Sequence, residues 1–254
     1  MRQRFFQKTN LISGLFLACL LLSACSEQPT EKLRIAVAAN AEGLARALAE
    51  EFSTTNNVEI DIISGSSGKL TSQISNGAPV DIFMAADLSY PQRLYNQGLT
   101  TAAPAPYAKG ILVLLSRQDF LKSGLTLPGL KTLAIPNPDL APYGRAAKEL
   151  LEYQDLWDEV RPNLVYAENA VQAATYVVSG AAQAAITAKS TAIQAQRESE
   201  VYVLDINKVH YKPIVQGVVL IKGENRHPAA SAFVDFLLSD AVKKLIKQQG
   251  YDLP

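Results

Sequence analysis

From Leu33 onward the sequence alternates short apolar runs with amphipathic stretches, and this alternation constrains the fold more than any other feature. Residues 33–39 form the first apolar run, and residues 42–53 then repeat apolar side chains at helical spacing. Apolar runs at 58–63 and 80–85 are each followed by a similar helical pattern. Successive strand–helix units predict an α/β fold with mostly parallel sheets, right-handed crossovers and helices on both faces.

The alternation is interrupted at residues 100–107, where two prolines and several small residues replace the pattern. It then resumes, and a long apolar run at 213–221 can carry the chain back to its first half. A chain that leaves one α/β lobe, builds a second and returns forms a hinged cleft. We therefore expect two lobes with a ligand cleft between them, the first made of residues 33–108 and 216–254 and the second of residues 109–215.

Residues 1–24 have the composition of a secretory signal peptide, with a basic start and an apolar run too short to span a membrane comfortably. The run ends in Leu22-Ser23-Ala24-Cys25, which resembles the lipobox of bacterial lipoproteins. We expect cleavage before Cys25 and lipidation of its sulfur; a plain signal peptide cleaved nearby is the alternative. We further expect residues 25–32 to form a tether and the protein to be a membrane-anchored lipoprotein on the periplasmic or cell-surface side.

Cysteine, histidine and charge content argue against several classes of protein. Cys19 and Cys25 are the only cysteines and lie in or beside the signal segment, so the mature domain has no disulfide and no thiolate metal site. His210 and His227 are the only histidines, and their separation does not suit a histidine metal site. Residues 25–254 contain 21 basic and 24 acidic side chains, without the basic excess of a nucleic-acid-binding protein.

Four loops fall between the end of a predicted strand and the start of a predicted helix, at residues 38–40, 65–68, 141–144 and 168–170. Each leaves helix N–H groups unpaired, and the helix dipole adds partial positive charge, so an anion can be held without a formal cation. Helix capping is the simpler interpretation of any single loop. Their repetition at corresponding places indicates a small anion pocket in the cleft.

The polar and charged residues near these loops do not form known enzymatic motifs. Residues 65–70 differ from a phosphate loop, because two residues rather than four separate the glycines and leucine follows Lys69. A serine nucleophile would need a different spacing and a histidine partner. We expect Asp81 and Asp87 to accept backbone hydrogen bonds, Lys69 and Arg145 to be solvated, and the protein not to be an enzyme.

The loops and one strand resemble the molybdate-binding proteins of ABC transporters, a family of two-lobed periplasmic oxyanion receptors. Residues 77–87, GAPVDIFMAAD, are similar to the family signature GAP-x-D-[LI]-F-x-[SA]-A-D, and the other loops follow in the family's order between residues 33 and 251. The resemblance implies a periplasmic-binding-protein fold. It places the oxyanion ligands at Asn40, Ser67, Tyr143 and Ala170, the last two through backbone N–H groups.

Two positions depart from the common pattern of this family. Asn40 stands where many members have serine, and Ala188 stands where many have a tyrosine whose phenol binds the ligand. A branch of the family with asparagine at the first site and tyrosine at the third resembles this sequence better. We infer that the phenol of Tyr143 replaces the missing one.

We therefore expect a monomeric, lipid-anchored receptor that captures molybdate, and also tungstate, without a cofactor and delivers it to the membrane permease of an ABC transporter. Discrimination against sulfate would come from cavity size, since donors placed for a larger anion cannot all reach a smaller one. The alternatives are a receptor for another small oxyanion such as sulfate or phosphate, a surface-anchored α/β hydrolase, and a degenerate receptor that acts as a sensor or scaffold.

Overall fold

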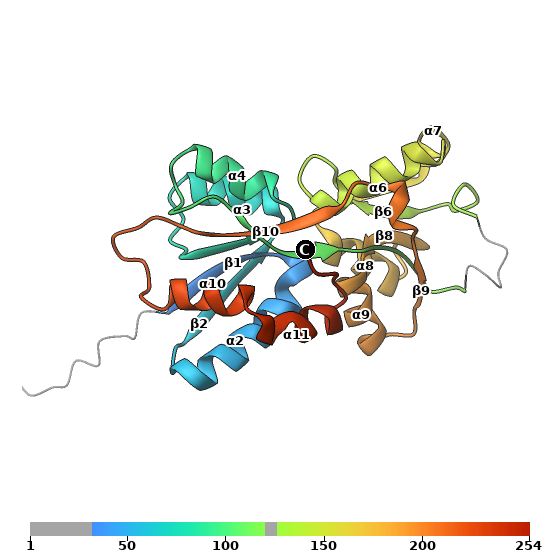
Figure 1. Cartoon of the computed structure of the whole chain (residues 1–254). Helices are drawn as coiled ribbons and strands as arrows, with labels where there is room; N and C mark the ends of the chain where they lie inside the picture. Colours follow the sequence, from blue (N-terminus) through green and yellow to red (C-terminus); the bar gives the residue numbers. More distant parts are fainter. Residues whose placement is uncertain (1–31, 120–125) are drawn as a thin grey trace, which may run out of the picture. The chain divides into compact units, whose positions relative to one another are not determined.

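The computed structural model describes residues 32–119 and 126–254. The predicted signal peptide, the lipobox, Cys25 and nearly all of the tether lie outside these ranges. The described part contains two five-stranded sheets, each flanked by helices on both faces (Figure 1). This arrangement confirms the predicted two-lobed α/β fold. No helix within the described ranges is long and apolar enough to cross a membrane.

The first lobe is built on a sheet with the strand order β2-β1-β3-β10-β4. β1 is parallel to both of its neighbours, whereas β10 is antiparallel to β3 and β4, so four strands run one way and β10 opposes them. The strands are β1 (Leu33–Ala38), β2 (Ile60–Gly65), β3 (Ile82–Ala85), β4 (Ala105–Gly110) and β10 (Ile214–Leu220).

The second lobe repeats this plan in the order β7-β6-β8-β5-β9, with β5 as the opposing strand. In each sheet four of the five strands therefore run in the same direction, as the alternation predicts. The strands are β5 (Leu112–Ser116), β6 (Leu133–Pro136), β7 (Leu164–Ala167), β8 (Ala184–Ala188) and β9 (Tyr202–Asp205).

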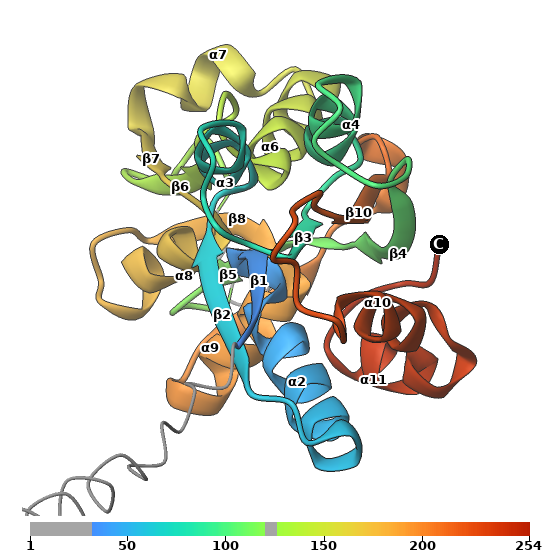
Figure 2. The ribbon, with the colours of Figure 1, turned by 90° about the vertical axis from the view of Figure 1, so that its left-hand side faces the viewer.

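Helices cover both faces of each sheet, as Figures 1 and 2 show. Around the first sheet these are α2 (Glu42–Asn56), α3 (Ser67–Ser75), α4 (Ser89–Asn96), α10 (Ala230–Leu238) and α11 (Lys243–Gln248). Around the second they are α6 (Pro142–Tyr153), α7 (Trp157–Val160), α8 (Ala170–Val178) and α9 (Lys189–Glu198). Short 3-10 turns complete the chain as η1 (Ala39–Ala41), η2 (Arg161–Asn163), η3 (Lys208–His210) and η4 (Asp240–Val242).

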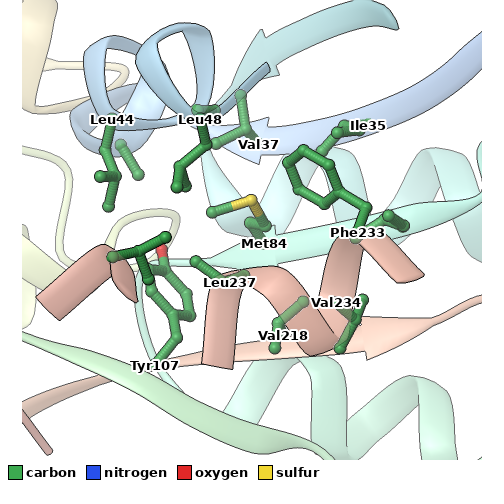
Figure 3. Close-up of a cluster of buried hydrophobic side chains, with 14 of the residues drawn as sticks. Ile35, Val37, Leu44, Leu48, Met84, Tyr107, Val218, Phe233, Val234 and Leu237 are labelled. Carbon is green, nitrogen blue, oxygen red and sulfur yellow. The ribbon is translucent and has the colours of Figure 1, made fainter. Parts of the chain in front are cut away.

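The core of the first lobe follows from the two-residue period of its strands, because successive side chains point to opposite faces. Ile35 and Val37 of β1 pack with α2 and α10 on one face, and Ala36 packs with α3 and α4 on the other. Figure 3 shows the first of these layers, in which Met84 of β3 lies between side chains of α2 and α10. The packing fixes the strand ends from which the binding loops emerge.

The expected lobe boundaries lie within two strands, β4 and β10. The proline-containing segment, residues 100–107, is expected to be only an approach to the lobe boundary, yet β4 begins within it at Ala105. Pro106 is compatible with this strand because β4 lies at the edge of its sheet, where a missing N–H is tolerated. The expected boundaries at 108/109 and 215/216 fall inside β4 and β10, which remain paired as far as Gly110 and Ile214.

Candidate functional site

The carboxyl ends of strands from both lobes border one small cavity of about 10 Å³. All four residues expected from the sequence, Asn40, Ser67, Tyr143 and Ala170, lie in its lining. The described residues that line it carry no formal charge and are Ala38, Ala39, Asn40, Gly65, Ser66, Ser67, Ala86, Ala141, Pro142, Tyr143, Asn169 and Ala170. With the lobes in contact, a space of this size holds no more than about one water molecule, so a larger occupant requires the lobes to separate.

Ser67 is the first residue of α3, and its hydroxyl is oriented by the first lobe. Its Oγ accepts a hydrogen bond from the backbone N–H of Ala86, at 3.0 Å. The hydroxyl proton therefore remains available for donation. Ser66, the preceding N-cap, accepts from the N–H of Lys69 and leaves the N–H of Ser67 as an unpaired first-turn donor. Ser67 can thus offer two donors to one anion.

Tyr143 lies at the start of α6, where the sequence leaves its N–H without a partner in the helix. Pro142 occupies the first helical position and has no N–H, and the N–H of Gly144 already donates to the carbonyl of Ala141, at 2.9 Å. The N–H of Tyr143 is the first-turn donor that remains. The preceding strand end fixes its direction, because Gly144 packs directly against the backbone of Pro136 and Asn137.

Ala170 provides a similar donor at the start of α8. The side chain of Asn169 caps this helix by accepting from the N–H of Gln172, at 3.0 Å. The cap pairs the N–H of the third residue of the helix, and the N–H of Ala170 has no partner within the helix. Because Ala170 is 3% exposed and lines the cavity, this N–H is shielded from bulk water.

The sequence suggests that the side-chain amide of Asn40 binds the ligand, but the structure leaves a different group of this residue available. Its Nδ2 donates to Gln216 Oε1 and to the hydroxyl of Tyr251, both at 3.1 Å. An amide nitrogen has two protons, so both are used within the protein. The expected side-chain donor is therefore committed elsewhere, and the group that Asn40 offers to the cavity is its backbone N–H in η1.

The phenol of Tyr143, which the sequence suggests as a ligand, has a partner within the protein. Its oxygen accepts a hydrogen bond from Gln216 Nε2, at 3.2 Å, beside Gly110 where the chain crosses between the lobes. Burial raises the pKa of this phenol well above its usual range, so it stays protonated. Ala188, the position of the absent phenol, is fully buried at the end of β8 and does not line the cavity.

A larger groove of about 360 Å³ lies between α2, α8 and α9 and shares Ala39 and Asn40 with the small cavity. Its lining includes the carboxylates of Glu42 and Glu198 and the guanidinium of Arg46, which pairs with Glu42, so the groove has no excess of positive charge to hold a dianion. The small cavity has only neutral groups and helix N-termini, whose partial positive charge favours an anion. The small cavity is therefore the better candidate for an anion site.

The acidic residues beside the loops have capping roles, and two of the basic residues make contacts that the sequence did not predict. Asp81 accepts from the N–H groups of Arg34 and His227, both at 2.8 Å, as expected. Asp87 caps the start of α4 but also pairs with Arg145 of the second lobe. Lys69 pairs with Glu168, at 3.2 Å. Arg145 and Lys69 therefore each form an ion pair with an acidic residue of the opposite lobe and are not purely solvated charges.

Sequence reasoning missed the buried polar residues behind the cavity, Tyr107, Gln216 and Tyr251. The one available signal was Gln216, a polar residue within the apolar run at 213–221. Within the described ranges, no group of three or more histidine, cysteine, aspartate or glutamate side chains could hold a metal ion. The site can therefore act by hydrogen bonding, with donors contributed from both sides of a cleft.

Two α/β lobes joined by crossing strands, with a cavity between them that is lined by helix starts, define the class of two-lobed solute receptors. The chain belongs to the bacterial extracellular solute-binding protein family, whose model matches residues 33–252. It is 33% identical to the molybdate-binding protein ModA of Azotobacter vinelandii over 91% of this chain and 94% of that protein. It is 27% identical to a putative ABC transporter substrate-binding lipoprotein of Bacillus subtilis, over 97% and 98% of the two chains.

The solved structures agree with this assignment. The periplasmic molybdate-binding protein of Azotobacter vinelandii superposes with a TM-score of 0.81 at 33% identity, covering 88% of this chain and all of that chain. The fold and the family thus rest on both sequence and structure.

Proposed function

We propose that this protein is the substrate-binding component of an ABC importer and that it captures molybdate. The observation that carries the proposal is the charge-free cavity in which Asn40, Ser67, Tyr143 and Ala170 converge at the starts of helical segments from both lobes. The name of the Azotobacter relative, a molybdate-binding protein, supports the choice of anion. The site needs no cofactor, because its donors belong to the chain.

Neutral donors suit an anion that is fully deprotonated. A basic side chain would attract protonated and deprotonated anions alike. An acidic side chain would favour a protonated ligand. Backbone N–H groups and a hydroxyl have only protons to offer, so they complement an oxyanion whose oxygens are all acceptors. A larger tetrahedral anion reaches all of these donors, whereas with a smaller one some remain unpaired at a cost of about 1–3 kcal/mol each.

Titration calorimetry of residues 26–254 with molybdate, tungstate, sulfate and phosphate tests this function. We expect molybdate and tungstate to bind at least 100-fold more tightly than sulfate, because two unmade hydrogen bonds of that size correspond to a factor of this order. Equal affinity for sulfate would reduce the assignment to a general oxyanion receptor. An absence of heat with molybdate and tungstate would overturn it.

Four further features belong to the same proposal. Cys25 is lipidated after removal of residues 1–24, which anchors the receptor on the periplasmic or cell-surface side. The receptor acts as a monomer and presents its closed form to a membrane permease. Tungstate binds in the same cavity. The lipoprotein relative from Bacillus subtilis supports the anchor, and incorporation of labelled fatty acid into the wild type but not into Cys25→Ala would test it.

The ion pair between Arg145 and Asp87 is expected to stabilise the closed form. Arg145 lies in the first turn of α6, where the helix dipole disfavours a cation, and its Nη1 also donates to the Tyr90 hydroxyl at 3.3 Å. Its guanidinium lies 5.3 Å from the centroid of the Tyr90 ring. Arg145→Gln should weaken molybdate binding about fivefold, equivalent to roughly 1 kcal/mol, chiefly through faster release. Stopped-flow fluorescence measures this rate.

The second pair across the cleft, Lys69 and Glu168, provides the control. Both of its side chains are more exposed than Asp87, so Lys69→Gln should change the release rate less than twofold. Asp87→Asn should accelerate release no further in the Arg145→Gln background if the two residues act as one pair. Full additivity of the two substitutions would contradict the pairing.

A further inference from the structure

A buried polar cluster lies behind the anion cavity and is not explained by packing alone. It consists of Asn40, Tyr107, Tyr143, Gln216 and Tyr251, and none of the five is more than 7% exposed. We call it the Gln216 cluster. The ring of Tyr107 belongs to the apolar layer drawn in Figure 3, so the cluster joins the core of the first lobe to the cavity.

Gln216 lies at the centre of this cluster, and both the oxygen and the nitrogen of its side-chain amide form hydrogen bonds. Oε1 accepts from the Tyr107 hydroxyl at 2.8 Å and from Asn40 Nδ2 at 3.1 Å. Nε2 donates to the Tyr143 hydroxyl at 3.2 Å. Tyr107 and Asn40 belong to the first lobe and Tyr143 to the second, so one side chain connects a binding loop of each lobe.

The position of Asn40 is fixed further from two sides. Its carbonyl accepts from the Tyr251 hydroxyl at 2.6 Å and, across the cleft, from Ser190 Oγ at 2.9 Å. Gly110 lets the phenol of Tyr143 approach the crossing strand, since a Cβ at that position would lie 2.2 Å from the phenolic oxygen. The backbone donors of Asn40 and Tyr143 are therefore held at a defined separation through their own side chains.

We propose that Gln216 is a positioning residue that sets the separation between the anion donors of the two lobes, and thereby the size of anion that the receptor prefers. This inference rests on the proposed oxyanion-binding function. Gln216 does not line the cavity and acts through Asn40 and Tyr143. An apolar residue would suit a fully buried position in β10, so the buried amide needs a reason beyond stability.

Gln216→Leu tests the proposal in residues 26–254 by calorimetry with molybdate and sulfate. We expect molybdate affinity to fall at least tenfold, because the bonds that place Asn40 and Tyr143 are lost. Sulfate affinity should change less than threefold, so the preference for the larger anion shrinks. If Gln216 had a purely structural role, the substitution would lower the affinity for both anions by the same factor. An unchanged ratio of the two affinities in a folded variant would overturn the proposal.

If Gln216→Leu does not fold, a second variant and its control can still test the proposal. Tyr107→Phe removes one partner of Gln216 without changing Asn40 or Tyr143, and it should reduce the molybdate-to-sulfate ratio about threefold. Tyr211→Phe is the matched control: this buried tyrosine accepts from the N–H of Leu112 within the second lobe, so its loss should lower Tm without altering the ratio. A change in ratio for the control alone would contradict the proposal.

Gln216→Glu adds a pH readout. The tyrosines that face this position, Tyr107, Tyr143 and Tyr251, have raised pKa values because they are buried, the last at about 12, and they stay neutral between pH 6 and 9. An ionised glutamate cannot donate to Tyr143 and adds negative charge behind the cavity, whereas a protonated one restores the donor. Molybdate affinity of this variant should rise at least tenfold from pH 9 to pH 6, with the wild type changing less than twofold.

The wild-type titration separates the two possible failures. Molybdate binding by the wild type with an unchanged ratio in the variants would reject the role of Gln216 and leave the proposed function intact. No binding by the wild type would reject the function itself.

Discussion

Replacing Gly144 by alanine is expected to abolish molybdate binding and to destabilise the protein by about 3 kcal/mol or more. A Cβ on Gly144 would lie 2.2 Å from the carbonyl oxygen of Pro136 and within 2.8 Å of two backbone atoms of Asn137. Backbone cannot rotate away as a side chain can, so the start of α6 must move away from the end of β6. This movement carries the N–H of Tyr143 out of the cavity.

Chemical denaturation and calorimetry measure the two effects of Gly144→Ala separately. Gly43→Ala is the matched control, because Gly43 also lies in the first turn of a helix beside the cavity, and its nearest neighbour is a flexible side-chain atom of Gln249 at 3.6 Å. Alanine there should leave molybdate affinity unchanged and raise stability slightly. Normal molybdate affinity in Gly144→Ala would mean that the Tyr143 N–H is not a ligand.

Ser67→Ala is expected to weaken molybdate binding by about 1.5–3 kcal/mol, which corresponds to roughly 10–150-fold in Kd. The substitution removes a hydroxyl donor to a charged ligand, and hydrogen bonds to charged groups are worth more than neutral ones. It also leaves the buried N–H of Ala86 without its acceptor. Part of the cost should therefore appear as a lower Tm even without ligand.

Thr71→Val separates these two consequences of Ser67→Ala. The buried Thr71 hydroxyl, one turn further along α3, donates to the carbonyl of Ser67 at 2.7 Å and does not line the cavity. Its loss should lower Tm by a similar amount while molybdate affinity stays within twofold of the wild type. If Ser67→Ala and Thr71→Val weakened binding equally, the hydroxyl of Ser67 would not be a ligand.

Much of the fold could be predicted from the sequence because each strand and helix follows from the pattern of residues within its own segment. The strands β1, β3 and β7 are short apolar runs, and the helices after them repeat apolar residues at helical spacing. The strand β4 was missed because its proline contradicts a strand pattern, and only its place at the edge of the sheet makes that proline acceptable. Edge position is a property of the assembled sheet.

The candidate site was likewise predicted only in part. Unpaired N–H groups at Ser67, Tyr143 and Ala170 follow from the local start of a helix, so the sequence alone located them. The direction of the Asn40 amide did not follow, because its partner Gln216 lies 176 residues away.

The sequence by itself determined two α/β lobes and the loops that carry neutral donors, since strand and helix periods and helix starts depend on neighbouring residues. Only the tertiary structure decided that the Asn40 amide and the Tyr143 phenol bind Gln216 and that Arg145 pairs with Asp87. These contacts join side chains brought together by the crossing strands and the closure of the lobes. No local pattern records which distant group will satisfy a buried polar atom, although each such atom needs a partner.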